Sequence, residues 1–289
     1  MVEYNVTLEG KTVLVTGAAG FIGSNLVKRL FQEVKDIKVI GIDSITDYYD
    51  VNIKVERLKE IESLQRDWTF VHASIADKVA VETIFTEHKI AVVVNLAAQA
   101  GVRYSITNPD AYIQSNLIGF YNIPATGLRF FTVYGPAGRP DMAYFGFTNK
   151  LVKGDTIKIF NYGNCKRDFT YVDDIVEGVV RIMRHAPEKQ NGEDGLPIPP
   201  YKVYNIGNNS PENLLDFVTI LQEELVRAGV LPQDYDFDAH KELVAMQPGD
   251  VPVTYADTTP LEQDFGFKPN TSLREGLRRF AEWYAGYYK

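Results

Sequence analysis

Short apolar runs alternate with longer amphipathic stretches along the first third of the chain. The first run, Thr12–Thr16, is rich in β-branched residues and ends at a glycine, which is typical of a buried strand. The next stretch, Phe21–Val34, repeats its apolar side chains at helical spacing. Further strands and helices are then predicted in alternation at Lys38–Ile42, Asn52–Leu64, Trp68–Val71, Lys78–His88 and Ala91–Leu96. This alternation predicts a parallel sheet with right-handed crossovers.

The pattern is less regular after Leu96. Helices are predicted at Asp110–Asn122, Asp173–His185, Pro211–Ala228 and Ser272–Tyr284, and one strand-like run at Leu128–Tyr134. We therefore expect an α/β protein, with a Rossmann doubly wound parallel sheet and a smaller mixed C-terminal subdomain.

Composition narrows the class of protein. The 289 residues are 45% hydrophobic and 24% charged, as in ordinary globular proteins that bury a sizeable core. A net charge of -8 argues against nucleic-acid binding, because no overall positive field attracts phosphates. Cys165 is the single cysteine, and no Cys/His cluster indicates a metal site. The start of the sequence does not resemble a signal peptide, and no apolar stretch is long enough to span a membrane, so we expect a cytoplasmic protein.

Three glycines follow the first predicted strand with the spacing G-x-x-G-x-x-G. They are Gly17, Gly20 and Gly23. In this setting one glycine permits a tight turn, one lets the backbone approach a pyrophosphate, and one lets helix and strand pack closely. The free N–H groups at the start of the following helix, at Phe21 and Ile22, then face the phosphates.

An acidic residue completes this pattern. Asp43 ends the second predicted strand, 20 residues after Gly23. A carboxylate there accepts hydrogen bonds from the adenosine ribose and repels a 2′-phosphate. The sequence therefore predicts NAD rather than NADP as cofactor, and we place the neighbouring Ser44 in the same site.

The glycine spacing resembles that of the extended short-chain dehydrogenase/reductase superfamily, and the resemblance runs from about Thr12 to the last helix. NLAAQAGVRYS and YIQSNLIGFYN look like the family's segments beside the cofactor. RFFTVYGPAGRPDMA and KRDFTYVDDI are similar to substrate-side motifs of nucleotide-sugar epimerases. AQAGVR together with FFTVYGPAGRPDMA points to the UDP-glucuronate 4-epimerase branch, and the segment from MQPGDV onward is similar to the family's C-terminal end.

The resemblance implies a set of functional residues. Beside NAD it places Leu96, Ala97, Ala98, Gln99 and Asn116. Toward a UDP-sugar substrate it places Arg103 at the pocket edge, Thr132 and Arg139 facing the sugar, and Arg167 with Asp250 on the UDP portion. Taken alone, each such arginine is more often a solvated surface charge. One departure is Ser74-Ile75, where the family usually has Asp-Ile near the adenine. The family often dimerises through two helices per subunit, and this sequence retains one of them, Asp110–Asn122, so a homodimer remains an expectation.

The residues that perform the family's chemistry are missing. That chemistry needs a Ser or Thr and a Tyr-x-x-x-Lys pair on one helix face, where Lys lowers the Tyr pKa and phenolate takes the proton from the sugar 4-hydroxyl. The single Tyr-x-x-x-Lys here, Tyr162 to Lys166, contains Gly163 and Asn164, which favour a turn. The expected strand–loop–helix block is absent between Ile123 and Pro124, so the catalytic residues are unknown. Either the natural protein contains residues that this sequence lacks, which we favour, or the protein is a deletion form.

These observations lead to one prediction with two alternatives. Residues 1–144 are expected to form an NAD-binding Rossmann domain with a missing segment near 123/124. Residues 145–289 are expected to form mainly a substrate-binding subdomain, with return segments to the first domain. The predicted activity is that of an isomerase: NAD-dependent epimerisation of a nucleotide sugar, UDP-glucuronate to UDP-galacturonate, at C4 through a 4-keto intermediate. The alternatives are a nucleotide-sugar 4,6-dehydratase and a catalytically inactive form that binds NAD or a UDP-sugar.

Overall fold

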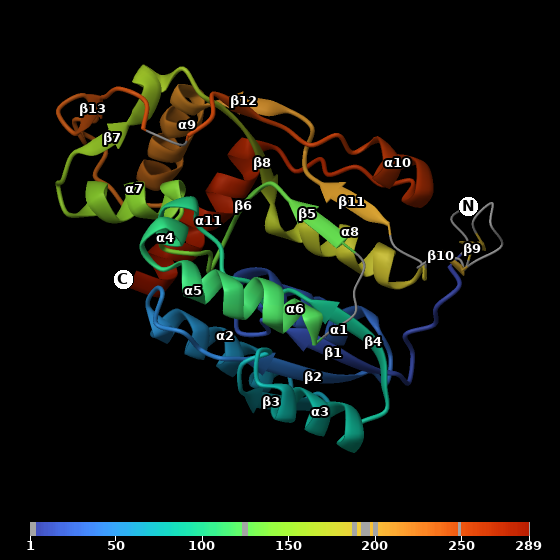
Figure 1. Ribbon diagram of the computed structural model, residues 1–289. Coiled ribbons are helices and arrows are strands. Elements are labelled where there is room, and N and C mark those ends of the chain that lie inside the picture. The colour runs from blue at the N-terminus through green and yellow to red at the C-terminus, as the bar shows by residue number, and fades with distance from the viewer. Residues whose placement is uncertain are drawn as a thin grey trace. The chain divides into compact units, whose positions relative to one another are not determined.

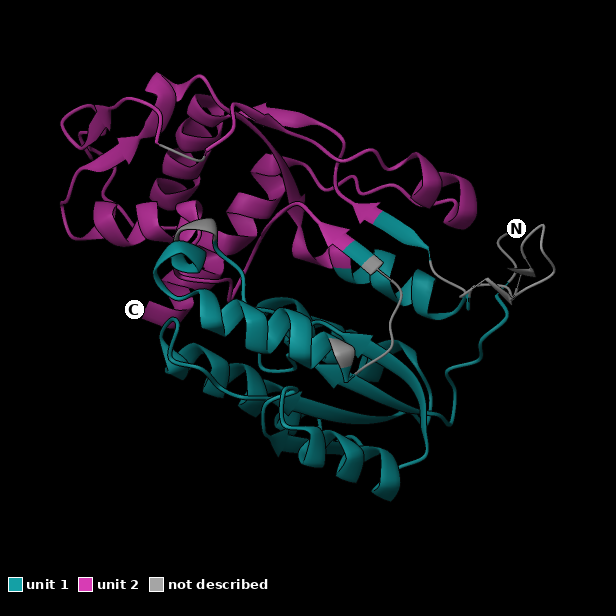
Figure 2. Cartoon of the chain, viewed as in Figure 1, with its two compact units in different colours: residues 1–128, 176–204 teal, residues 129–175, 205–289 magenta. Residues whose placement is uncertain are grey.

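The computed structural model describes residues 4–122, 127–186, 190–191, 197–198, 202–247 and 250–288. The side chains of Val102, Arg103 and Tyr121 are outside this description, and so is the predicted break between Ile123 and Pro124. The chain divides into two compact units (Figure 2): residues 1–128 with 176–204, and residues 129–175 with 205–289. The domain boundary predicted at residue 144 stays a prediction.

The first unit is built on a parallel sheet of four strands in the order β3-β2-β1-β4 (Figure 1). Its elements are β1 (Thr12–Thr16), α1 (Phe21–Glu33), β2 (Lys38–Asp43), α2 (Val51–Ser63), β3 (Trp68–His72), α3 (Lys78–Glu87) and β4 (Ile90–Asn95). This order and alternation are those of the nucleotide-binding half of a Rossmann fold. The predicted fold class is confirmed, and the predicted bounds of these elements differ from the observed ones by at most one residue at either end.

The core of this unit follows from side-chain alternation along the strands. Leu14 on β1 and Ile40 and Ile42 on β2 are buried in one cluster with Val81 and Ile84 of α3. Neighbouring strand residues point to the other face, so both faces of the sheet are apolar and need helices to cover them. The carboxyl ends of the parallel strands meet at one edge, and the glycine loop and Asp43 lie there.

The segment after β4 is helical but irregular. It consists of α4 (Val102–Thr107), α5 (Pro109–Tyr112), a π-helical stretch η1 (Ile113–Ile118) and α6 (Gly119–Tyr121). The regular helix predicted over Asp110–Asn122 is therefore interrupted by a wide π turn. Such turns are rare and often occur at functional sites, and this one contains Asn116.

Several elements contain the chain positions at which one unit passes into the other, or belong to the first unit outside its four-stranded sheet. They are β5 (Gly127–Phe130), α8 (Val172–Met183), β9 (Gln190–Asn191), β10 (Pro197–Ile198) and β11 (Val203–Ile206). β5 pairs with β11, and β9 with β10. The single strand predicted at Leu128–Tyr134 is thus divided into β5 and β6.

The second unit is organised around β8. Its elements are β6 (Thr132–Tyr134), α7 (Ala143–Val152), β7 (Ile157–Ile159), η2 (Phe160–Gly163), β8 (Lys166–Tyr171), β12 (Pro211–Asn213), α9 (Leu214–Arg227), β13 (Lys241–Leu243), β14 (Val253–Thr254), α10 (Thr259–Phe265) and α11 (Leu273–Tyr288). The first half of β8 pairs with β12 and β14, and the second half pairs with β6. This mixed sheet agrees with the predicted mixed character of the C-terminal part.

Helix α9 begins later than the sequence predicts. The predicted start at Pro211 lies in β12, which pairs antiparallel with β8. Asn213 caps the helix, because its side-chain oxygen accepts a hydrogen bond from Leu215 N. The preceding residues are therefore free to join the sheet.

Candidate functional site

The glycine loop leaves β1 in a conformation that only glycines fit. Gly17 has φ +66, and a Cβ there would lie 2.9 Å from Ala97 N. A Cβ on Gly20 would lie 2.8 Å from Gly17 O, and one on Gly23 would lie 2.2 Å from the same oxygen. Gly17 therefore makes the turn beside the end of β4, and Gly20 and Gly23 bring the start of α1 against that turn.

This turn leads directly into the first amides of α1. Gly20 N donates to Gly17 O at 2.9 Å, and Ser24 N donates to Gly20 O at 3.0 Å. Among the described residues, none accepts a hydrogen bond from the backbone N–H of Phe21, Ile22 or Gly23. Three free donors at the positive end of a helix suit a pyrophosphate.

Asp43 reaches from β2 to the same loop. Its Oδ2 accepts a hydrogen bond from Ala19 N at 3.1 Å, and its Oδ1 accepts one from Ile45 N at 2.8 Å. Each carboxylate oxygen has a second lone pair for a ribose hydroxyl. The structure therefore brings Gly17, Gly20, Gly23 and Asp43 together at one edge of the sheet, as the sequence predicts.

The end of β4 is tied to β1 and to the π turn. Thr16 Oγ1 donates to Asn95 Oδ1 and accepts from Leu96 N and Ala97 N, at 3.1 and 3.0 Å. Asn116 makes two bonds to Gln99: its Oδ1 accepts from Gln99 N at 2.8 Å, and its Nδ2 donates to Gln99 O at 2.9 Å. The segment from Leu96 to Gln99 is thereby held beside Gly17, with Ala98 exposed.

The side of the site next to β3 is polar. Ser44 is exposed, and its carbonyl accepts a hydrogen bond from His72 Nε2 at 3.2 Å. Ser74 Oγ accepts from Ala76 N at 3.2 Å, so this hydroxyl takes part in the turn after β3. The site thus offers free amides, a carboxylate, and a close-packed glycine turn in which added Cβ atoms would clash. This combination fits a dinucleotide.

One buried cation belongs to this site although sequence reasoning missed it. Arg57 on α2 is 1% exposed, and its Nη1 donates to Ala19 O at 3.0 Å and to Tyr49 Oη at 2.8 Å. Its guanidinium lies 5.9 Å from the ring centroid of Phe21. No local motif indicates this contact, because it joins residues 38 positions apart.

In the second unit, the predicted sugar-side residues lie around β6. Thr132 begins β6 and pairs with Phe169 of β8. Arg139 forms a bidentate ion pair with Asp141, with Nε–Oδ1 at 3.0 Å and Nη2–Oδ2 at 2.6 Å. The Asp141 carboxylate thus already accepts from the Nε and Nη2 edge of the guanidinium, which is the edge that would donate to an anionic sugar.

The two residues predicted for the UDP portion form an ion pair with each other. Arg167 Nη2 donates to Asp250 Oδ1 at 2.6 Å, and Nη1 donates to Lys166 O and Pro252 O, at 3.0 and 3.3 Å. These bonds join the start of β8 to the segment that leads into β14. The side chain of Arg103, the remaining predicted substrate residue, lies outside the described residues.

Tyr162 and Lys166 do not form a catalytic pair. Tyr162 lies in η2 with φ +50 and is 57% exposed, whereas Lys166 begins β8. The two residues therefore share no helix face, in agreement with the turn expected from Gly163 and Asn164.

Two buried tyrosines are also unsuited to proton abstraction. Burial raises the pKa of Tyr134 well above its usual value, and the charge of Asp174 raises it further. Burial, with the charge of Asp173, raises the pKa of Tyr171 to about 12. Both phenols stay protonated at neutral pH, so neither can replace a tyrosine whose pKa must be lowered.

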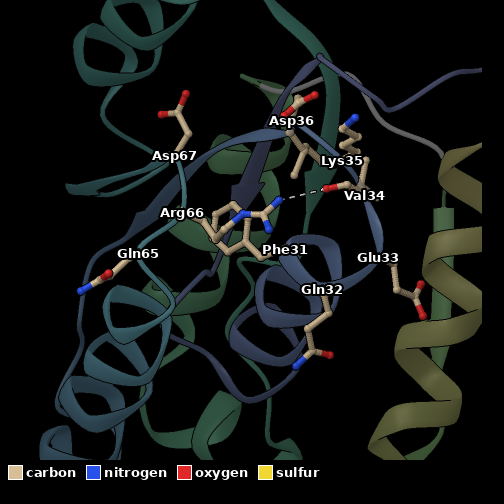
Figure 3. Close-up of a pocket in the computed structure, with 10 residues that line it drawn as sticks. Phe31, Gln32, Glu33, Val34, Lys35, Asp36, Gln65, Arg66 and Asp67 are labelled. Atoms are coloured by element: carbon tan, nitrogen blue, oxygen red, sulfur yellow. Dashed lines mark hydrogen bonds between the residues drawn. The ribbon is translucent and has the colours of Figure 1, made fainter.

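A pocket of about 610 Å³ lies at the other edge of the first sheet (Figure 3). It is lined by the end of α1 and by residues that precede β2 and β3, among them Val34 and Arg66. Arg66 Nη2 donates to Val34 O at 3.3 Å. Because the strands are parallel, their amino ends lie opposite the glycine loop, and this pocket is separate from the candidate site.

Two features are absent from the described residues. None of their helices is both long and apolar enough to cross a membrane. Within the same residues, no group of three or more His, Cys, Asp or Glu side chains is arranged to hold a metal ion. The expectation of a cytoplasmic protein stays a prediction.

Two family models match consecutive parts of the chain. The model for GDP-mannose 4,6 dehydratase matches residues 14–124, and that for the NAD dependent epimerase/dehydratase family matches residues 119–207. The first match ends and the second begins around Ile123 and Pro124, where the sequence predicts a missing block.

Relatives match nearly the whole chain. Protein CapI of Staphylococcus aureus is 40% identical, over 96% of this chain and 99% of its own length. UDP-glucuronate 4-epimerase 2 of Arabidopsis thaliana is 36% identical, over 98% of this chain and 78% of its own length. The crystal structure of UDP-glucuronic acid 4-epimerase from Bacillus cereus, in complex with UDP-glucuronic acid and NAD, has a TM-score of 0.76 at 25% identity, over 94% and 98% of the two chains. DesIV, a dTDP-glucose 4,6-dehydratase from Streptomyces venezuelae, shares the fold with a TM-score of 0.77 at 20% identity, over 96% and 97% of the two chains.

The alignment with CapI has more positions than this chain has residues to fill them. It runs over 345 positions, whereas 96% of 289 residues is about 277 residues, so about 68 positions hold no residue of this chain. That is enough for a strand, a loop and a long helix. The relatives therefore contain internal residues that this chain lacks. By its relatives and its fold, the chain belongs to the NAD-dependent epimerase/dehydratase family, the nucleotide-sugar-modifying branch of the extended short-chain dehydrogenases/reductases.

Proposed function

We propose that this protein acts in the NAD-dependent 4-epimerisation of a nucleotide sugar, with UDP-glucuronate and UDP-galacturonate as the interconverted pair. The observation that carries the proposal is the cofactor cradle, in which three free amides of α1 and Asp43 face the same edge of the sheet. The relatives named for UDP-glucuronate epimerisation support the choice of substrate.

The residues of this chain have distinct parts in the proposed reaction. The amides of Phe21, Ile22 and Gly23 bind the pyrophosphate, and Asp43 binds the adenosine ribose. When bound, NAD would supply a reversible hydride acceptor for C4 of the sugar, and return of the hydride to the opposite face would leave no net oxidation. Leu96 to Gln99, held by Asn116, would position the cofactor beside the sugar.

Most of the proposed sugar-nucleotide residues lie in the second unit. In this unit, Arg167 and Asp250 hold the UDP portion, and Thr132 and Arg139 face the sugar. Arg103, proposed at the pocket edge, belongs to the first unit. The guanidinium of Arg139 is ion-paired with the carboxylate of Asp141. An acidic sugar therefore has to displace Asp141 or share the guanidinium with it.

Proton transfer at the 4-hydroxyl requires the strand–loop–helix block that would follow Ile123. The present sequence supplies binding residues but no Tyr-x-x-x-Lys pair on a helix. We therefore expect the 289-residue chain to bind NAD without turning over UDP-glucuronate. A chimera that carries the corresponding block of CapI between Ile123 and Pro124 is expected to gain turnover.

Three measurements test this proposal. The mass of the natural protein distinguishes a real deletion, near 32.6 kDa, from a longer chain. Equilibrium dialysis measures NAD binding, with Asp43→Ala as the variant that lacks the ribose acceptor. Chromatography of UDP-glucuronate and UDP-galacturonate follows turnover by the chain and by the chimera. The proposal fails if the chain does not bind NAD, or if the intact protein contains no Tyr-x-x-x-Lys helix and interconverts no sugar.

We also propose a homodimer through the helical segment after β4. Ile113, Leu117 and Phe120 on this segment are exposed apolar side chains. Light scattering of the wild type and of Leu117→Glu tests this proposal, since a charge among these apolar side chains should shift a dimer to a monomer.

A further inference from the structure

Two loops meet above the carboxyl end of β1. Since β1 lies between β2 and β4, the loops that follow β2 and β4 begin on opposite sides of Gly17. The usual strand spacing separates β2 and β4 by roughly 9–10 Å. Nevertheless, the ring centroids of Tyr48, in the loop after β2, and Tyr104, in α4, are 4.7 Å apart. This ring contact therefore spans the edge of the sheet from which the glycine loop begins.

The β4 side of this contact is anchored by hydrogen bonds and by close packing. Tyr104 Oη accepts from Asn108 Nδ2 at 2.7 Å, and Tyr112 Oη donates to Gly101 O. Gly101 has φ +113, and a Cβ there would lie 2.6 Å from Tyr48 Oη. Glycine at position 101 thus lets the hydroxyl of Tyr48 approach the backbone.

The β2 side is fastened to the glycine loop itself. Tyr49, next to Tyr48, accepts a hydrogen bond from the buried guanidinium of Arg57, which also donates to Ala19 O. Ala19 N in turn donates to Asp43. Ala19 is therefore held at both backbone groups: its carbonyl by Arg57, and its N–H by Asp43, the proposed ribose acceptor.

We propose that Tyr48 and Tyr104 form an aromatic strap across the NAD site, and that Arg57 is the positioning residue that fastens this strap to the glycine loop. The inference rests on the NAD binding proposed above. A dinucleotide with its pyrophosphate on the start of α1 lies beneath the ring contact. The contact has to open before the cofactor leaves, so the strap slows release.

The release rate of NAD tests the strap. Bound 1,N6-etheno-NAD, a fluorescent analogue, is chased with excess NAD in a stopped-flow instrument. Breaking one aromatic pair should accelerate release roughly twofold to tenfold. We expect this acceleration in Tyr48→Ala and in Tyr104→Ala. The double variant should release the analogue no faster than either single variant, because both substitutions remove the same contact.

Two tyrosine variants serve as controls. Tyr48→Phe retains the ring and should release the analogue more slowly than Tyr48→Ala. Tyr162→Ala removes an exposed tyrosine of the second unit and should leave release unchanged. If Tyr48→Ala and Tyr104→Ala both bind the analogue fully and release it at the wild-type rate, the proposed strap is wrong. The proposed function would not be affected by that result. Absence of binding in the wild type would overturn both.

The part assigned to Arg57 has its own test. Arg57→Met should accelerate release, and combining it with Tyr48→Ala should add little, because both act through the strap. Arg66→Met is the matched control, since Arg66 also lies 5.9 Å from a phenylalanine ring and donates to a backbone carbonyl, but at the opposite edge of the sheet. Fully multiplicative effects of Arg57→Met and Tyr48→Ala on the release rate would refute the positioning role, even where both variants are less stable.

Discussion

Replacing Gly23 with alanine would put a methyl group 2.2 Å from Gly17 O and 2.9 Å from Gly17 C. Real Cβ contacts essentially never fall below 3.0 Å, so the methyl group is about 0.8 Å too close to the oxygen. The obstructing atoms belong to the backbone of the glycine loop and cannot rotate away. The loop itself therefore has to move away from α1.

The energetic effect has two parts of opposite sign. Alanine gains about 1 kcal/mol of helix propensity over glycine. Overpacking at backbone atoms costs about 1–3 kcal/mol, so the net loss of stability is up to about 2 kcal/mol. For a domain of this size, the loss corresponds to a fall in Tm of up to about 8 °C. Because this movement separates the loop from the start of α1, which carries the proposed phosphate-binding amides, NAD affinity should fall at least tenfold, or about 1.4 kcal/mol.

Equilibrium dialysis with NAD and differential scanning calorimetry measure these effects. Gly286→Ala, in α11, is the matched helix control, since nothing lies within 4 Å of its added Cβ. It should keep or raise Tm and leave NAD affinity unchanged. Gly154→Ala strains a turn with φ +74 but contacts nothing, so it should lower Tm without affecting NAD. Unchanged NAD affinity in Gly23→Ala would refute the assignment of this loop to the cofactor.

Three other predictions concern the first sheet's edge and the buried tyrosine. Asp43→Asn should raise the ratio of NADP to NAD affinity at least tenfold, since the charge that repels a 2′-phosphate is gone; an unchanged ratio in dialysis would contradict this. Asn116→Ala should lower the unfolding free energy by about 2 kcal/mol, through two lost bonds to Gln99, and weaken NAD binding; urea titration and dialysis would detect this. The pKa of Tyr171 is raised to about 12, so the unfolded chain loses this proton first, and stability should fall between pH 10 and 12. In Tyr171→Phe, the free energy of unfolding measured by urea titration should fall less steeply with pH. The same slope as in the wild type would exclude Tyr171 as the cause of the fall.

Local sequence patterns were sufficient to predict the first sheet and the position of the glycine loop and Asp43 at one edge of it. Each strand from β1 to β4 is a short apolar run, and the glycine loop and Asp43 follow from spacing along the chain. The contact of Arg57 with Ala19 and the contact of Tyr48 with Tyr104 each join residues that are distant in sequence. No periodicity along the chain predicts them. The strands β12 and β14 contain only three and two residues, which is too few for an alternating pattern. Their pairing with β8 depends on tertiary structure.

The burial of β4 bears on how the missing block would affect the proposed proton transfer. Within the described residues, β4 is hydrogen-bonded only to β1, and Ala91 is exposed although the strand reads Ile-Ala-Val-Val-Val-Asn. Apolar runs of this kind normally lie between two strands and beneath helices on both faces. The partial burial of β4 is what the removal of a neighbouring strand would leave. The glycine loop and Asp43, by contrast, depend on β1 and β2, whose pairing is complete. The same gap can therefore remove proton transfer while leaving the proposed NAD site formed.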